Sequence, residues 1–166
     1  MSARLCLTLA AILGFLGVFL GAFGAHGLKD SGFLKTKYAD VQPIDYAGEE
    51  LAAGYKYLLD FDTGVRYHMW HALAMAVTGI LMLHHGCRAL RAAAWCFFFG
   101  IIFFSGSLYV LVIAGPRAGG IPWGAVAPIG GTLLLIGWLS LAVGTRRIEV
   151  ANPGNHHAAC ATPVGP

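Results

Sequence analysis

Charged side chains are scarce in this chain. They make up 11% of its 166 residues, whereas soluble domains carry about 25%. So few charges cannot cover a chain in which 57% of the residues are hydrophobic, which excludes an ordinary soluble domain. The formal net charge is only +3, and the basic residues are scattered, so we expect no nucleic-acid partner.

Cysteine is also rare, and its spacing excludes the usual cysteine-based sites. Cys6, Cys87, Cys96 and Cys160 form no Cys-x-x-Cys pair, so neither a disulfide framework nor a zinc site is predicted. The sequence has no Gly-rich phosphate loop and no Ser-His-Asp arrangement. No pair of carboxylates lies inside an apolar run, which disfavours a proton-coupled transporter because such proteins use intramembrane carboxylates.

What the sequence does contain is four apolar runs, at about 5–25, 67–83, 92–114 and 124–144. A span needs about 20 residues, or about 17 at the shortest, to cross a hydrocarbon core of about 30 Å. We therefore predict an all-α membrane protein with a four-helix transmembrane bundle over 1–150 and a disordered tail over 151–166. A cleaved signal peptide is the alternative for the first run, but that run exceeds the usual length of about 7–15 apolar residues.

A long polar stretch over 28–66 separates the first two runs and holds nearly all the acidic residues. Within it, Leu51, Tyr55 and Leu58 recur at near-helical spacing. This spacing predicts a short amphipathic helix over 49–62 that lies on the membrane surface. A structured loop without that helix is the alternative.

Four spans would place both termini and the short second loop on one side of the cell membrane. That side holds five arginines: Arg4, Arg88, Arg91, Arg146 and Arg147. The opposite side holds a similar number of basic residues, but in longer segments. Because orientation follows the basic residues that flank short segments, we expect a multi-pass protein with cytoplasmic termini.

Glycines recur along single faces of the first and last runs. Gly14, Gly17, Gly21 and Gly24 follow one another at steps of three and four, and Gly130 and Gly137 are seven apart. Such spacing lets another helix approach closely. We expect these faces to pack against helices of the same chain, a second copy or another membrane protein. Trp138 lies too deep in its run for an interfacial role and is expected to pack between helices.

Several polar residues fall near one membrane face when the antiparallel path is traced. They are His26, Arg66, His68, His71, Ser105, Ser107, Tyr109 and Pro128. Ionisable groups within spans are costly and tend to face a bundle interior or a water-filled cavity, so this cluster is the candidate binding site. The alternatives are interfacial anchoring for His26, Arg66 and His68, an interhelical hydrogen bond for His71, and simple packing for the serines.

Histidines on facing helices can also ligate haem iron. His26 and His71 are the pair that would do so here. No Cys, His or carboxylate spacing supports a metal site, so no cofactor is predicted, and haem or a metal remains an alternative.

Four segments resemble one known family. They are Gly-Ala-Phe-Gly-Ala-His-Gly-Leu (21–28), Thr-Gly-Val-Arg-Tyr-His-Met-Trp-His-Ala-Leu-Ala (63–74), Phe-Ser-Gly-Ser-Leu-Tyr (104–109) and Ala-Pro-Ile-Gly-Gly (127–131). The chain is similar through all four spans to the small membrane family classed as domain of unknown function 423. The resemblance implies a four-helix membrane protein and brings no established activity. The first loop is longer than usual in that family, and the tail is extra.

We therefore expect a non-enzymatic membrane protein in contact with the lipid bilayer. It would act as an accessory component or bind a lipid or small solute. The alternatives are a redox or metal protein with histidine ligands, a small transporter or channel, and an enzyme that uses Tyr109 or a histidine as its acid–base group.

Overall fold

The computed structural model describes residues 1–146, and these residues form mainly long helices. The helices are α1 (Ala3–Ala22), which continues into the π-helix η1 (Phe23–Asp30), α3 (Ala53–His84), α4 (Arg88–Ile113) and α5 (Trp123–Thr145). The Ser2 side chain starts α1 by accepting the Leu5 N–H at 3.3 Å, as N-cap residues do. The predicted tail over 151–166 and Arg147 lie outside the described residues.

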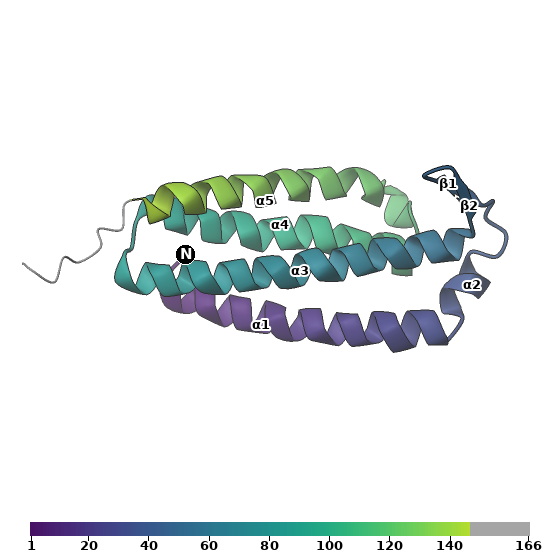
Figure 1. Ribbon diagram of the computed structural model, residues 1–166, viewed down its shortest axis with the longest axis horizontal. Coiled ribbons are helices and arrows are strands. Elements are labelled where there is room, and N and C mark those ends of the chain that lie inside the picture. The colour runs from purple at the N-terminus through teal and green to yellow at the C-terminus, as the bar shows by residue number, and fades with distance from the viewer. Residues whose placement is uncertain (147–166) are drawn as a thin grey trace, which may run out of the picture.

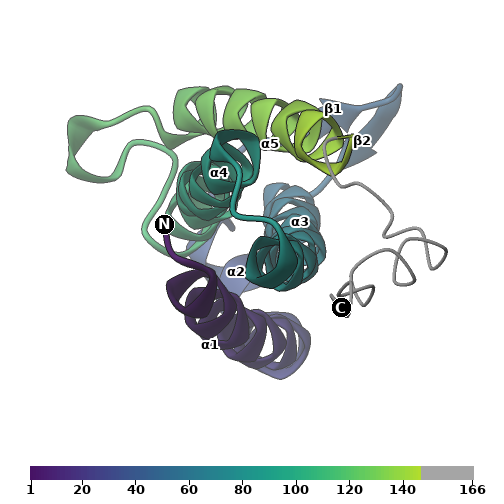
Figure 2. The same cartoon turned by 90° about the vertical axis from the view of Figure 1, so that its left-hand side faces the viewer.

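The long helices run up and down along one axis (Figure 1). Helix α3 packs on both α1 and α4, and α4 packs on α5. Both views place α1 and α5 at opposite edges, with α3 and α4 between them (Figure 2). The N-terminus and the α3–α4 turn therefore lie at one end of the helices, and the long first loop lies at the other.

Three helical segments are long and apolar enough to cross a membrane: Ala3–Asp30, Arg88–Ile113 and Trp123–Thr145. This agrees with the predicted all-α membrane protein. Helix α3 is not among them, although the sequence predicted a span over 67–83. The charged Asp62 and Arg66 lie in its first half, and His68 and His71 lower the hydropathy of the rest.

The predicted surface helix over 49–62 is wrong. Residues 49–51 form the strand β2 (Glu49–Leu51), which pairs antiparallel with β1 (Ile44–Tyr46). Ala47 and Gly48 make the turn with positive φ values of 56° and 88°, and the Gly48 N–H donates to the Asp45 side chain at 2.9 Å. Residues 53–62 are instead the first turns of α3, because no proline separates them from the apolar run that follows.

The first loop folds back onto the end of α4. After Gly32, at φ 68°, the short helix α2 (Phe33–Lys37) leads to Tyr38, which donates to the carbonyl of Val112 at 3.0 Å. The Lys37 ammonium donates to the carbonyl of Ile113. The last carbonyls of a helix lack partners within it, so these two side chains complete the C-terminal end of α4. Burial, and then the neighbouring Tyr57, raises the pKa of Tyr38, which keeps its hydroxyl protonated as a donor.

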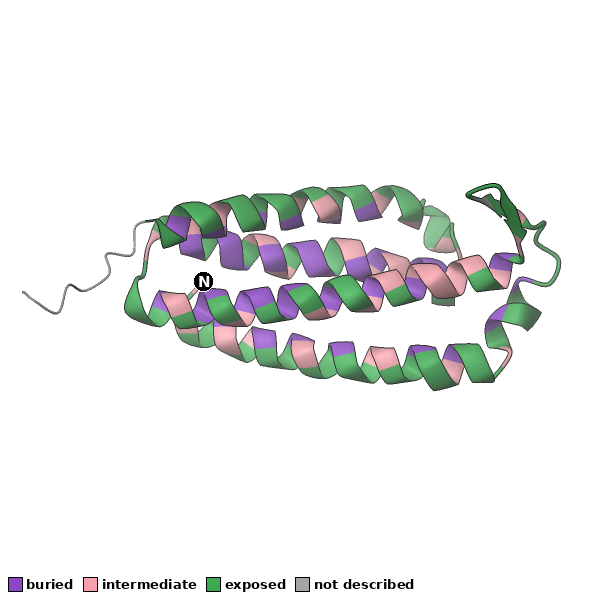
Figure 3. Ribbon diagram, viewed as in Figure 1, coloured by how far each residue is buried: buried purple, intermediate pink, exposed green. Residues whose placement is uncertain are grey.

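Burial is concentrated on the inner sides of the helices (Figure 3). Phe97, Leu90 and Met75 are fully buried in one cluster, and Phe61 centres a second cluster at the loop end. The outer faces are apolar but exposed: Phe15 on α1 is 71% exposed and Leu139 on α5 is 69% exposed. Large apolar side chains on the outside are expected where hydrocarbon, not water, surrounds the helices.

Candidate functional site

His68 links three helices in the buried interior. It is 3% exposed on α3, and its Nδ1 lies 3.2 Å from the hydroxyl of Tyr109 on α4. Gly64, one turn earlier, makes room, because a Cβ there would lie 3.0 Å from Tyr109 Cε1. On the other side, a Cβ on Gly17 of α1 would lie 3.6 Å from His68 Cδ2. Two glycines thus allow one imidazole to contact α1 and α4.

Two serines of α4 lie near this pair. Ser105 is fully buried one turn before Tyr109, and Ser107 donates to the Phe104 carbonyl at 2.9 Å. Among the described residues, Ser105 Oγ and His68 Nε2 are the buried side-chain atoms that lack a hydrogen-bond partner. Buried polar atoms without partners are costly in a low-dielectric interior.

His71 faces a different neighbour, α5. Its Nε2 lies 3.1 Å from Trp138 Nε1, and its Nδ1 lies 2.8 Å from the Tyr67 carbonyl. An indole N–H is only a donor and a carbonyl is only an acceptor. Nε2 therefore accepts from Trp138, and Nδ1 carries the proton that is donated to Tyr67. Both ring nitrogens are occupied, and the imidazole is held neutral in one tautomer.

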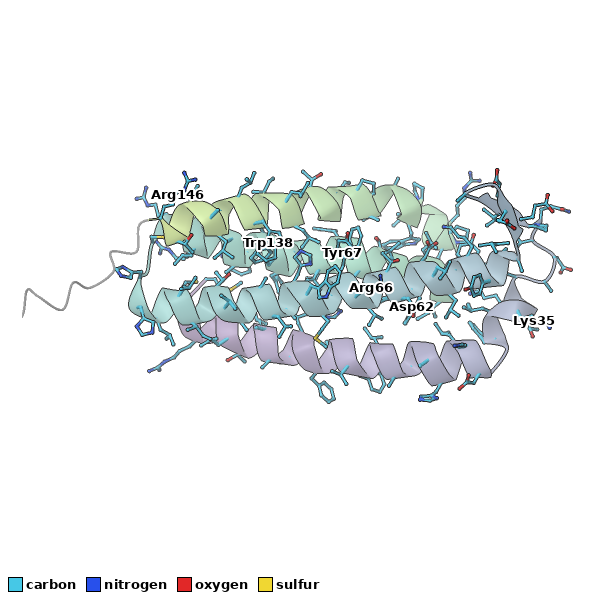
Figure 4. All side chains as sticks on the ribbon, viewed as in Figure 1. Lys35, Asp62, Arg66, Tyr67, Trp138 and Arg146 are labelled. Atoms are coloured by element: carbon cyan, nitrogen blue, oxygen red, sulfur yellow. The ribbon has the colours of Figure 1, made fainter. Side chains whose placement is uncertain are left out.

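An apolar groove of about 630 Å³ runs beside His71 between α3 and α5. Its lining consists of Tyr67, Trp70, His71, Leu73, Phe104, Gly131, Leu134, Leu135 and Trp138. Figure 4 shows Tyr67 and Trp138 between these two helices. Trp70, Leu73 and Leu135 are exposed, so the groove opens sideways, toward the space that lipid would fill.

The predicted cluster is therefore divided. His68, Ser105 and Tyr109 come together at the α3–α4 contact, and His71 belongs to the groove. His26 lies on the outside of η1, where its Nδ1 is 3.2 Å from Asp30 Oδ2. Arg66 and Pro128 are also exposed.

The structure does not bring His26 and His71 together. Gly24, just before His26, packs on Phe61, and His71 lies ten residues further along α3, or roughly 15 Å. His71 also points to α5, whereas His26 is exposed. Within residues 1–146, no group of three or more His, Cys, Asp or Glu side chains is placed to hold a metal ion. The geometry does not favour this pair as the two ligands of one haem.

Most of the predicted packing glycines contact a neighbouring helix. Gly17, Gly21 and Gly24 face side chains of α3, and Gly130 and Gly137 face α4. Gly14 differs, because no atom lies within 4 Å of the position of its missing Cβ.

Sequence reasoning missed the pairing of His71 with Trp138 and the role of Tyr38 and Lys37 on α4. A signal for the first existed: a tryptophan deep in an apolar run needs an acceptor for its N–H, and histidine is among the few acceptors in these runs. No comparable signal marked the second, because it depends on how the loop folds.

Comparison with known proteins adds relatives of unknown activity. A family model described as protein of unknown function (DUF423) matches residues 20–131. A UPF0382 membrane protein of Haemophilus influenzae is 39% identical over 140 residues, which cover 84% of this chain and 91% of that protein. YwdK of Bacillus subtilis is 36% identical over 84% of this chain and 94% of its own length.

The inner membrane protein YgdD of Escherichia coli is 32% identical over 155 residues, which cover 90% of this chain and 95% of that protein. No solved structure matches the chain.

Proposed function

The chain belongs to the DUF423 family, as its four motifs predicted, and from this membership and the groove between α3 and α5 we propose a lipid-binding role. The protein would be a non-enzymatic, multi-pass component of the cell membrane that holds one hydrocarbon chain of a membrane lipid. The observation that carries the proposal is the sideways-opening apolar groove beside His71.

The path of the chain supports α3 as a fourth span. Helix α1 ends at the loop end, and α4 begins at the opposite end (Figure 1). If α1 and α4 both cross the membrane, α3 must return through it. His71 is then accommodated because its two ring nitrogens face Tyr67 and Trp138, and His68 has Tyr109 as the partner of its Nδ1. Arg88 and Arg91, in the first turn of α4, favour a cytoplasmic position for that end and for the N-terminus.

The walls of the groove suit a hydrocarbon chain. Its volume of about 630 Å³ falls within the range of about 300–1,000 Å³ that is usual for small-molecule sites. Gly131 has no side chain to occupy the groove, and the nearest atom to a Cβ there would be Phe104 Cδ2 at 3.7 Å. An apolar chain from the surrounding bilayer can therefore enter without a desolvated polar group on either side.

The hydrogen bonds of His71 favour binding over acid–base chemistry. A general acid or base needs a ring nitrogen that reaches the substrate, and here one nitrogen donates to Tyr67 while the other accepts from Trp138. The imidazole instead fixes the Trp138 ring, which also packs edge-on against Phe97 with centroids 5.4 Å apart. His71 would thus set the shape of the groove.

The test compares two glycine-to-leucine variants by native mass spectrometry in mild detergent. Gly131→Leu would fill the groove, whereas Gly14→Leu adds the same side chain at an open position on α1. We expect Gly131→Leu to carry one co-purified lipid fewer than wild type and Gly14→Leu, with equal helical content by circular dichroism. Equal lipid retention in both variants would overturn the proposal.

A further inference from the structure

We propose that a separate pocket at the loop end binds an anionic phospholipid, with one acyl chain inside and the headgroup phosphate at Lys29 and Lys35. The proposal does not rest on the groove between α3 and α5. The pocket has a volume of about 640 Å³. It lies between the segment 28–43 and the first turns of α3, and its lining includes no acidic residue.

The interior of this pocket is apolar and well built. Leu28, Leu34, Tyr38 and Ala53 are all buried and line it. The backbone of α2 lies directly on α3, because a Cβ on Gly54 would be 2.8 Å from the Leu34 carbonyl oxygen. The hydroxyl of Tyr38 is directed to α4, where it donates to Val112. The pocket therefore offers the aromatic and aliphatic parts of these side chains to a ligand.

Its charged lining residues are both lysines. Lys29 and Lys35 are exposed and form no ion pair within the part of the chain that the structure describes. Two of the nearby acidic groups are paired, Asp30 with His26 and Asp60 with Lys56, whereas Asp40 is exposed next to the lining residue Ala39. Two free ammonium groups beside an apolar pocket complement a ligand that has a negative head and an apolar tail.

The location of the pocket indicates that the surrounding bilayer supplies the ligand. Leu28 follows the apolar part of the first segment, and Tyr38 binds the last carbonyls of α4. The pocket thus lies where two membrane-spanning segments end, which is the depth of lipid headgroups. Lys35 is at this end and Arg146 at the other (Figure 4). A phospholipid of the bilayer already has its phosphate at this depth and its chains beside the pocket.

The experiment presents the full-length protein with equal amounts of dioleoyl phosphatidylglycerol and dioleoyl phosphatidylcholine and counts bound lipids by native mass spectrometry. The two lipids share their chains, so any preference reports the headgroup. We expect wild type to prefer phosphatidylglycerol. Each lysine removed, in Lys29→Gln and Lys35→Gln, should lower that preference about fivefold, the ratio that corresponds to about 1 kcal/mol for a basic residue near an anionic surface.

Three further variants make the result specific. Arg88→Gln/Arg91→Gln removes two charges at the opposite end and should leave the preference unchanged. Ala39→Phe should fill the pocket and abolish the preferred adduct with the lysines intact. Gly131→Leu should keep the preference, because it affects only the groove. The proposal fails if wild type shows no preference, or if Lys29→Gln/Lys35→Gln retains the preference of wild type.

Discussion

The two outer helices are attached to the centre of the molecule in different ways. At Gly130, helix α5 lies against the backbone of α4, because a Cβ there would be 2.7 Å from the Cα of Phe104. At Gly137, α5 lies equally close to a large side chain, since a Cβ would be 2.7 Å from Phe97 Cδ1. Helix α1 meets mostly side chains of α3, since a Cβ on Gly21 would be 3.3 Å from Val65 Cγ1. Near Gly21, the side chains of the α1–α3 contact can therefore move more easily than the backbone atoms at Gly130.

The polar groups also differ between the two contacts. The α1–α3 contact includes Cys6, whose thiol donates to the Met75 carbonyl at 3.2 Å. The α4–α5 contact has glycine and large apolar side chains in alternation, with Leu134 over Gly100 and Leu90 against Gly144. In lipid, no hydrophobic force drives helices together, so close packing and interhelical hydrogen bonds must do so. Helix α1 combines a looser fit with a thiol hydrogen bond from Cys6 to α3, whereas α5 combines close packing on α4 with the hydrogen bond from Trp138 to His71 of α3.

The largest effect is expected from Gly130→Ala. The added methyl group would overlap the backbone of α4, which cannot rotate away as a side chain can. We expect a loss of about 3 kcal/mol in the free energy of unfolding, the upper end of the range for overpacking. Thermal unfolding in detergent would measure it. The control is Gly14→Ala, which meets no atom within 4 Å. Equal stability of the two variants would remove the distinction between the contacts.

A smaller loss is expected from Tyr109→Phe. The change leaves His68 Nδ1 buried without its partner at 3.2 Å. An unsatisfied buried polar group costs about 1–3 kcal/mol, so we expect a loss of about 1–2 kcal/mol. Tyr55→Phe, at an exposed tyrosine of the same type, is the matched control and should unfold like wild type. No difference between the two variants would show that His68 finds another partner.

Trp138→Phe should have a weaker effect on stability. It removes the N–H that binds His71 Nε2, and interhelical hydrogen bonds in membranes average about 0.6 kcal/mol. Nitrogen NMR shifts of His71 would report the loss directly, since Nε2 would no longer accept from an indole. Trp95→Phe on α4 is the control. If the His71 shifts are the same in Trp138→Phe and wild type, the pairing does not persist in solution.

The smallest effect is expected from Gly17→Ala. A Cβ there would be 3.3 Å from the terminal methyl group of Met69, which can rotate away. Alanine is also favoured over glycine in a helix by about 0.5–1 kcal/mol, which offsets the crowding. We expect a change within about 0.5 kcal/mol in unfolding measurements. A loss as large as that of Gly130→Ala would make the two outer contacts alike.

The sequence by itself determined three of the long helices, because hydropathy and length are properties of each segment alone. The apolar runs at 5–25, 92–114 and 124–144 correspond to the segments Ala3–Asp30, Arg88–Ile113 and Trp123–Thr145. Hydropathy and length suffice for these because a bilayer demands a continuous apolar surface. The helical period likewise placed Gly130 and Gly137 on one face, and that face lies against α4.

The partners of the polar residues were decided only by the tertiary structure. His68 and His71 are three residues apart, about 60° around the helix axis, and the sequence placed them in one cluster. In the structure, that angle is enough to direct His68 to Tyr109 of α4 and His71 to Trp138 of α5. The rotation of α3 about its own axis depends on how closely the neighbouring helices pack on it. The glycines that permit this packing lie on those helices or on other turns of α3. Sequence therefore determines that a helix is apolar and which residues share a face, and the packing of all the helices determines what that face meets.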